Sequence, residues 1–294
     1  MKPAPFSYLR PTTLAEALAA YADNADAKIL AGGQSLVPLL SMRLAAPDML
    51  IDINRIAELN FVRADENGVT FGALARHAVL EKDETARRAQ PLLSKALRLV
   101  AHPTIRNQGT TLGSIVHADA AAEMPMVLVL LGGTVTAESA RGSRTISAGD
   151  LYVGPLESSL ESGEIATQAW VPALAADTGT AIDEVSRRHG DYALCGVAAL
   201  VGVGQDGAVR SARAGYLSVT ETPATVDLSE AFGDGTLSSA NLAAAADIAM
   251  AAIDPETDIH ATADYRRHLA GVLTRRVIAA AHDDALARTK GVAA

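Results

Sequence analysis

A short apolar run near the N-terminus ends abruptly on a pair of glycines. Residues 27–31 read Ala-Lys-Ile-Leu-Ala, and Gly32, Gly33, Gln34 and Ser35 follow at once. The run predicts a strand, and a glycine pair directly after it predicts either a tight turn or a backbone that must come close to an anion. The pattern is neither GxGxxG nor a P-loop, so it indicates neither a nicotinamide site nor a Walker site.

A second segment rich in glycine and hydroxyl groups reads IRNQGTTLGSIVHADAAAEMP, residues 105–125. It carries three hydroxyl side chains around two glycines: Gly109, Thr110, Thr111, Gly113 and Ser114. From His102 to Asp119 the chain has little helical or strand period, which predicts a long loop of the kind that is often functional. Two such segments in one domain suit a diphosphate that is held from both sides.

Several side chains of the second segment have two interpretations. Asp119 either caps the helix predicted to follow or accepts hydrogen bonds from the hydroxyl groups of a nucleotide. Arg106 is either a counter-charge for the anion or part of an ion pair. His117 is interpreted as an interior histidine rather than a catalyst, because no partner acid or base accompanies it.

A third segment, SRRHGDYALCG, covers residues 186–196. Gly190-Asp191 predicts a turn between two strands. Tyr192 follows this turn, and it either simply begins the next strand or lies against a flat conjugated ring.

The remaining pattern predicts two unequal parts with a boundary in the turn-rich stretch at 172–180. The first part has a capping box at Thr13 and Glu16 and a hairpin turn at Asn67-Gly68. Its other predicted elements are strands at 49–53, 134–138, 144–147 and 164–171, helices within 75–100 broken at Pro91, and a helix at 121–131. The second part is predicted to contain strands at 181–187, 193–203 and 208–219 and helices at 239–252 and 263–288.

Composition excludes several classes of protein. The formal net charge of -9 argues against a nucleic-acid partner. The single cysteine, Cys195, excludes an internal disulfide and a cysteine-ligated metal or iron–sulfur site in this chain. No apolar stretch approaches the roughly 18 residues of a membrane span, and the start lacks the apolar core of a signal peptide. These observations predict a cytoplasmic protein without membrane insertion.

Four motifs in this order, ILAGGQSLVP, HPTIRNQGTTLGSIVHADAAAEMP, SRRHGDYA and YRRHLAGVLTRRVIAAA, resemble the FAD-binding medium subunit of the molybdenum hydroxylases, the xanthine dehydrogenase and carbon monoxide dehydrogenase family. The resemblance implies an α+β chain. An FAD-binding domain of the vanillyl-alcohol-oxidase (PCMH) type, residues 1–175 with subdomains of about 1–55 and 56–175, precedes a C-terminal domain at 176–294 with a small antiparallel sheet and helices.

The resemblance also implies a set of FAD contacts, with Tyr192 beside the isoalloxazine ring and Ile165 either near that ring or an ordinary strand residue. The implied residues are Ile29, Leu30, Ala31, Gly32, Gly33, Gln34, Ser35, Leu36, Ala101, Gly109, Thr110, Gly113, Ser114, Asp119, Ile165 and Tyr192. Two positions depart from the family pattern: Gln34 replaces a frequent histidine, and Leu112 replaces a glycine. A leucine is costly if that position requires a positive φ.

The function implied is electron transfer without substrate oxidation on this chain and without catalytic or metal-binding residues. A large subunit would carry the molybdopterin cofactor and a small subunit two [2Fe–2S] clusters, in a dimer of heterotrimers, and FAD on this chain would pass electrons to an external acceptor. Two alternatives remain at this point: a stand-alone FAD-dependent oxidase or reductase, and a scaffold subunit that has lost its flavin.

Overall fold

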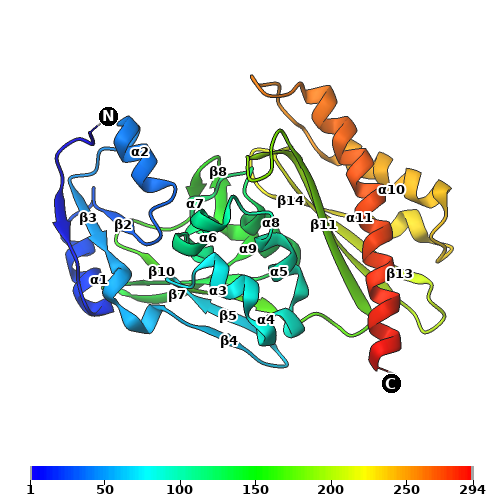
Figure 1. The fold of residues 1–294 in the computed structure, drawn as a ribbon, viewed down its shortest axis with the longest axis horizontal. Helices are drawn as coiled ribbons and strands as arrows, with labels where there is room; N and C mark the ends of the chain where they lie inside the picture. Colours follow the sequence, from blue (N-terminus) through cyan, green and yellow to red (C-terminus); the bar gives the residue numbers. More distant parts are fainter. Residues whose placement is uncertain (1, 293–294) are drawn as a thin grey trace.

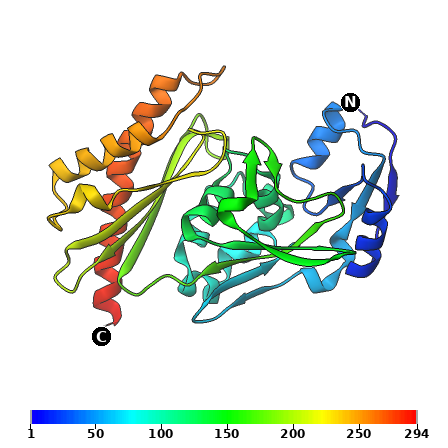
Figure 2. The same cartoon turned by 180° about the vertical axis from the view of Figure 1, so that it is seen from behind.

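The computed structural model describes residues 2–292. Three sheets of three or more strands follow one another along the molecule, each with its own helices, as Figure 1 shows from one side and Figure 2 from behind. Separate sheets combined with helices in this way confirm the predicted α+β class.

The N-terminal part is a parallel sheet of order β1-β3-β2. Its elements are β1 (Ser7–Leu9), α1 (Leu14–Ala22), β2 (Lys28–Leu30), α2 (Leu36–Met42) and β3 (Met49–Asp52). The predicted capping box is present at the start of α1. Leu30 is paired with Asp52, so the residues that follow β2 and β3 emerge side by side at one edge of the sheet. The glycine pair follows β2 at that edge.

The central part is an antiparallel sheet of order β4-β5-β10-β6-β7. Its strands are β4 (Val62–Ala64), β5 (Gly68–Gly72), β6 (Thr134–Ser139), β7 (Gly142–Ser147) and β10 (Ile165–Pro172). The predicted hairpin around Asn67-Gly68 is confirmed as β4 and β5. Short helices cover one face of this sheet (Figure 1): α3 (His77–Lys82), α4 (Glu84–Ala89), α5 (Pro91–Leu97), α6 (Pro103–Gln108), α7 (Thr111–His117) and α8 (Glu123–Leu131).

The predicted long loop between His102 and Asp119 is wrong, because this segment forms α6 and α7. Each helix is shorter than two turns, and α6 buries none of its side chains, so no helical period exists for the sequence to reveal. The predicted two helical pieces before it are three, since Asp83 interrupts them and its carboxylate accepts from the Ala86 amide at 2.8 Å. The sequence also did not reveal α9 (Ala148–Leu151) and the small hairpin of β8 (Tyr152–Gly154) and β9 (Glu157–Ser158).

The C-terminal part is an antiparallel sheet of order β11-β12-β13-β14. It consists of β11 (Thr178–Ser186), β12 (Ala193–Val203), β13 (Val209–Leu217) and β14 (Ala224–Asp227), followed by α10 (Ser239–Ala252) and α11 (Ala263–Val292). Within residues 2–292 no helix, α11 included, has the length and apolar character needed to cross a membrane.

This sheet lies between a helix of the central part and its own C-terminal helix. Neighbouring residues of β13 point to opposite sides: a Cβ on Gly215 would lie 2.7 Å from Met126 Sδ of α8, while the Tyr216 hydroxyl is 2.9 Å from Thr274 Oγ1 of α11. One buried apolar cluster spans the N-terminal and central parts and takes in Ala193, Ala198 and Leu217 of the C-terminal sheet. The central helices and the C-terminal sheet therefore share a core.

The contact between β11 and α11 depends on a glycine. A Cβ on Gly179 would lie 2.1 Å from the Ala281 carbonyl oxygen and 2.2 Å from the Ala285 amide nitrogen, both backbone atoms. We expect Gly179→Ala to force α11 away from the sheet and to lower the free energy of unfolding by about 1–3 kcal/mol in urea denaturation. Gly149→Ala, where the nearest atom is 3.9 Å away, is the control and should not lower stability, because alanine favours the helix α9 in which Gly149 lies. Equal stability of the two variants would contradict this packing.

Candidate functional site

The two glycine segments predicted to act together are in backbone contact. A Cβ on Gly32 would lie 2.7 Å from the Gln108 carbonyl oxygen, 2.7 Å from Gly109 Cα and 2.8 Å from the Thr110 nitrogen. No side chain fits between the two segments at this point. Gly33 has a φ of 72°, a conformation that favours glycine, so each residue of the pair has its own reason to lack a Cβ.

The second turn, which joins α6 to α7, is hydrogen-bonded to the segment that leads into α3. The His77 amide donates to the Gly109 carbonyl at 3.0 Å, and the Thr111 amide donates to the Ala75 carbonyl at 3.1 Å. His77 Nδ1 lies 3.1 Å from Thr111 Oγ1. Burial, and then the nearby Arg106 charge, lower the pKa of His77 to about 4, so this buried imidazole is neutral at physiological pH. The contacts make His77 a support for the turn.

The polar side chains of the two turns differ in what remains available to a ligand. Gln34 Nε2 donates to the Gly32 carbonyl at 3.0 Å, so this amide braces its own turn. Ser35 is exposed at the start of α2, and its hydroxyl makes no capping bond. Thr110 Oγ1 accepts from the Gly113 amide at 3.2 Å as the cap of α7, which leaves its O–H able to donate elsewhere. Ser114 is half-buried in the first turn of α7.

The apolar residues predicted at the site lie around these turns or in the core. Five of them are half-buried: Ile29, Leu30, Ala31, Leu36 and Ala101. Ile165 is 2% exposed on β10, within the large apolar cluster. Leu112, where relatives carry glycine, is a buried residue of α7 without a positive φ. The backbone strain that a positive φ would impose on Leu112 is therefore absent.

The two interpretations of Arg106 and Asp119 are resolved in part. Arg106 Nε is 2.9 Å from Glu81 Oε2, so Arg106 belongs to an ion pair. Asp119 does not cap the following helix, because the cap position of α8 is Ala122. Instead, Asp119 Oδ1 accepts from the Ala121 amide at 2.9 Å in a local turn. The prediction that Asp119 contacts a nucleotide stays a prediction.

Tyr192 lies at the end of a turn that sits on the second glycine segment. Gly190 has a φ of 82°, and a Cβ on it would lie 2.5 Å from Cε1 of His102, the residue before α6. Tyr192 is 68% exposed. Partial burial, and then the Asp119 and Glu123 carboxylates, raise the pKa of Tyr192. Tyr192 is thus brought to the same side of the molecule as Asp119.

Sequence reasoning missed two carboxylic acids beside Tyr192 and Asp119. Burial, and then Asp119, raise the pKa of Glu123 to about 7. Burial, and then Glu123 and Asp183, raise the pKa of Glu184 to about 8, and Glu184 Oε2 has no hydrogen-bond partner among residues 2–292. Glu123 begins α8 and Glu184 lies on β11, so no local pattern links them. The only sequence signal is a glutamate at the head of the apolar run Glu123–Leu131.

Three of the non-glycine residues with positive φ lie around this acidic side, and the other two, Arg43 and Ala101, lie elsewhere. The three are Ala118 (57°), Leu156 (58°) and Ser218 (62°). The Leu156 amide donates to the Ala118 carbonyl at 3.0 Å, and the Ser218 amide donates to the Ala120 carbonyl at 2.8 Å. Such residues cost on the order of 1 kcal/mol each and persist where surrounding structure imposes them. The β8–β9 hairpin and the end of β13 are thereby attached to the segment that carries Asp119.

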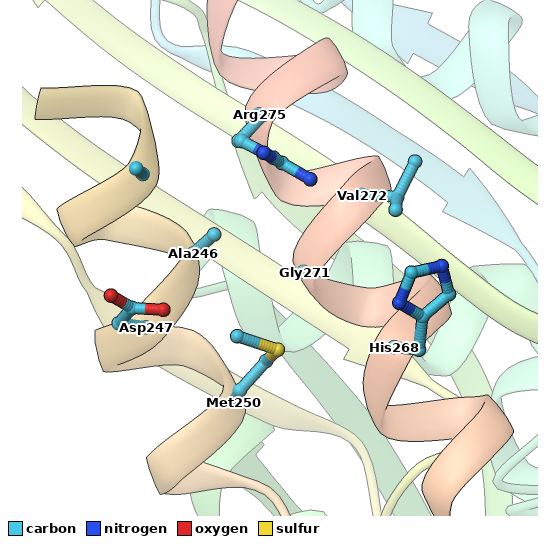
Figure 3. A pocket seen from close by; sticks show the side chains of 8 residues that line it. Ala246, Asp247, Met250, His268, Gly271, Val272 and Arg275 are labelled. Atoms are coloured by element: carbon cyan, nitrogen blue, oxygen red, sulfur yellow. The ribbon is translucent and has the colours of Figure 1, made fainter. Parts of the chain in front are cut away.

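Two surface pockets lie elsewhere. One of about 160 Å³ lies between α10 and α11, where Met250 and His268 come from opposite helices (Figure 3). The other, of about 220 Å³, includes Tyr21 and Arg141. Neither contains a predicted site residue, and among residues 2–292 no group of three or more His, Cys, Asp or Glu side chains is placed to hold a metal ion.

The junction of the two turns fits the predicted dinucleotide. Backbone without Cβ atoms at Gly32 and Gly33 allows close approach of a diphosphate, and Ser35 offers a hydroxyl that caps nothing else. Asp119 retains an oxygen, Oδ2, without a partner among the described residues, as an acceptor for hydroxyl groups. These donors and acceptors suit a dinucleotide and include no nucleophile activated by a neighbouring base.

Comparison with known proteins gives matches over nearly the whole chain. The family model described as "FAD binding domain in molybdopterin dehydrogenase" matches residues 4–174, and the one described as "CO dehydrogenase flavoprotein C-terminal domain" matches residues 180–281. The 6-hydroxypseudooxynicotine dehydrogenase complex subunit alpha of Paenarthrobacter nicotinovorans is 43% identical, over 96% of this chain and 96% of its own length. Caffeine dehydrogenase subunit beta of Pseudomonas sp. (strain CBB1) is 39% identical, over 96% and 97%.

Solved structures agree with these matches. Quinoline 2-oxidoreductase from Pseudomonas putida 86 contains a chain with a TM-score of 0.91 and 37% identity, which covers 97% of this chain and 99% of that chain. Carbon monoxide dehydrogenase from Hydrogenophaga pseudoflava contains one with a TM-score of 0.89 and 33% identity, which covers 98% of this chain and 99% of that chain.

The raised pKa of Glu184 predicts a pH dependence of stability. Between pH 4.5 and about 8 the unfolded chain has lost this proton while the folded chain keeps it, so stability falls as pH rises. We expect Glu184→Gln, which is neutral at every pH, to be more stable than the wild type at pH 8 by about 4 kcal/mol and equally stable near pH 4.

Thermal denaturation of the full chain at several pH values would measure this difference. The exposed Glu256→Gln is the control and should follow the wild type. If Glu184→Gln kept the same dependence on pH as the control, Glu184 would not be a neutral acid in the folded chain.

Proposed function

The chain belongs to the FAD-binding medium subunits of the heteromeric molybdenum hydroxylases, and from this premise we propose that it takes electrons from [2Fe–2S] clusters of a partner subunit and passes them to an external acceptor. The chain has one cysteine, so the several thiolates that such clusters require must come from another subunit. The observation that carries the proposal is the backbone contact of the two glycine turns at Gly32.

The proposed FAD site follows from the chemistry of the residues around this contact. Gly32, Gly33 and Thr110 would hold the diphosphate through backbone N–H groups, and Gly109, whose own N–H donates to the Ile105 carbonyl at 2.7 Å, would allow close approach because it has no Cβ. Ser35 and Ser114 would add hydroxyl donors. When bound, FAD supplies a redox centre that exchanges one or two electrons. The protein's part is to place it and to set the charges around it.

The isoalloxazine end is assigned to the side where Tyr192 lies. Tyr192, exposed and attached through the Gly190 turn to the second glycine segment, would cover or uncover one ring face. Asp119 would accept from hydroxyl groups of the cofactor. Burial raises the pKa of Glu123 to about 7 and that of Glu184 to about 8, so both acids would be partly protonated at pH 7 and would add less negative charge to this end of the site than two ordinary carboxylates.

We further propose the organisation of the chain and its complex. An FAD-binding domain at 1–175, with subdomains of about 1–55 and 56–175, would be followed by the C-terminal domain at 176–294. A large molybdenum subunit and a small iron–sulfur subunit would complete a dimer of heterotrimers. The relatives named above support this, since one is a subunit of a dehydrogenase complex and another a subunit of caffeine dehydrogenase. A cytoplasmic location is consistent with the single cysteine.

The first test concerns Gly32. A methyl group there would lie within 2.8 Å of three backbone atoms of the second turn, so we expect Gly32→Ala to separate the two turns and to remove most of the bound FAD. The measurement is releasable flavin and absorbance near ~450 nm in the assembled complex purified through a tag on this chain. Gly233→Ala, whose nearest atom is 3.7 Å away, should keep full flavin content. Full occupancy in Gly32→Ala would refute the assignment.

A second test separates electron transfer from substrate oxidation. We expect the complex to oxidise its substrate and this chain alone to have no hydroxylase activity on N-heteroaromatic compounds or aldehydes. In rapid mixing of the complex with substrate, the iron–sulfur absorbance should bleach before or together with the flavin absorbance. Reduction of the flavin by substrate or by NADPH in the isolated chain would favour the stand-alone oxidase or reductase instead. A complex without flavin would favour the scaffold.

A further inference from the structure

Arg76 joins the segment before α3 to the second glycine turn. Its Nη1 donates to the Gln108 carbonyl at 2.5 Å. That carbonyl oxygen is one of the atoms that leaves no room for a Cβ on Gly32. Arg76 and Thr110 also face each other as an isolated antiparallel β-bridge. The guanidinium group is therefore attached to the second turn at the point where the two turns touch.

Asn54 connects the same guanidinium group to the first turn. Arg76 Nη2 donates to Asn54 Oδ1 at 2.6 Å, and Asn54 Nδ2 donates to the Ala31 carbonyl at 2.8 Å. The parallel pairing of β2 with β3 brings Asn54 beside Ala31, because both residues follow paired strand ends. Three hydrogen bonds thus form a continuous path from Ala31 through Asn54 and Arg76 to Gln108.

The amide of Asn54 is held in a single orientation. The side-chain nitrogen Nδ2 also donates to Asp52 Oδ1 at 2.6 Å, and the backbone N–H of Asn54 donates to the same oxygen at 2.9 Å. Asp52 is itself bound by Arg10 Nε at 3.2 Å and by the Tyr8 hydroxyl. A flipped amide would place its NH₂ group against Arg76 and its oxygen against two acceptors. Asn54 is therefore well suited to orient Arg76.

The charge of Arg76 lacks a close counter-charge in the chain itself. Among residues 2–292 no carboxylate oxygen lies within 4.0 Å of its guanidinium group, whereas Arg106 pairs with Glu81 and Arg10 with Asp52. Both of its side-chain hydrogen bonds go to neutral oxygens and use two of its five N–H groups. Arg76 is half-buried, and burial lowers its pKa while Asp52 raises it, yet an arginine stays protonated. A partly desolvated cation of this kind is stabilised by an anion nearby.

We propose that Arg76, oriented by Asn54, is a positioning residue of the cofactor site, which holds the two glycine turns together and offsets the negative charge of the FAD diphosphate. This inference rests on the proposed function. It gives to Arg76 the role of counter-charge that one of the two interpretations offered for Arg106, because among residues 2–292 no carboxylate neutralises Arg76 at contact distance. It also gives a role to Asn54, which no motif of the sequence singled out.

The two parts of the proposal are separable by substitution. Arg76→Met removes the charge and both hydrogen bonds. Arg76→Lys keeps the charge but cannot make both bonds from one planar group. Asn54→Ala keeps the arginine but removes its orientation and the bond to Ala31. Arg87→Met is the matched control, since Arg87 is an exposed arginine of α4 without an ion pair among the described residues.

The experiment removes FAD from the assembled complex and titrates it back at low and high NaCl, with flavin fluorescence as the signal. We expect Arg76→Met to weaken FAD binding about tenfold to a hundredfold and Asn54→Ala about fivefold or more, as for the loss of hydrogen bonds to a charged group. In the wild type, the control and Arg76→Lys, added salt should weaken binding, whereas Arg76→Met should have lost most of this salt dependence. A purely structural role would not alter the salt dependence.

Several outcomes overturn the proposal. If Arg76→Met bound FAD with the same dissociation constant and salt dependence as Arg87→Met, the role of Arg76 would be refuted while the proposed function would stand. If Arg76→Lys bound FAD as weakly as Arg76→Met, and as insensitively to salt, the role of the charge would be refuted. Thermal melting would identify a variant that is merely misfolded. A wild-type complex that takes up no FAD would overturn both the proposed function and this inference.

Discussion

The arrangement of the candidate site depends on one contact, the approach of two backbone segments at Gly32. Here the turn after β2 touches the turn between α6 and α7, with no space for a methyl group between them. The contact joins the N-terminal parallel sheet to the helices of the central part. Backbone meets backbone here, and this is the arrangement that the proposed diphosphate site requires. Around this junction the chain adds hydrogen bonds from Asn54 and Arg76 that fix the separation of the turns.

Charge is distributed unevenly along the site. The junction of the turns carries Arg76 without a carboxylate partner within contact distance in the described residues, whereas the side with Tyr192 gathers Asp119, Glu123 and Glu184. Burial raises the pKa of Glu123 to about 7 and that of Glu184 to about 8, so near neutral pH the two glutamates carry less negative charge than their number suggests. A dinucleotide with a charged diphosphate and an uncharged flavin ring matches this division. The segments with positive φ at Ala118 and Ser218 keep the acidic side in place.

Sequence reasoning succeeded where a local pattern states the structure and failed where the pattern is short. The capping box at Thr13, the hairpin at Asn67-Gly68 and the α8 helix ending at Gly132 were all readable, since each depends on residues a few positions apart. The α6 and α7 helices were read as a loop, because helices of six and seven residues show less than two turns of period. Asp119 and Tyr192 stand out by their place before a predicted helix and after a predicted turn, and the family resemblance adds the flavin as their partner.

The sequence by itself determined that two glycine-rich turns exist, that the chain carries one cysteine, and which family the motifs resemble. Glycine has no side chain, and its placement after a strand is a local property, so these conclusions needed no tertiary structure. Only the tertiary structure decided that Gly32 abuts Gln108, that Arg106 is neutralised by Glu81 while Arg76 is not, and that Glu184 approaches Glu123. The partners in each of these pairs come from different elements, between 25 and 76 residues apart. The pairing of strands and the packing of helices on them decide which of several similar side chains contacts a given neighbour. No local pattern in a single sequence shows this choice.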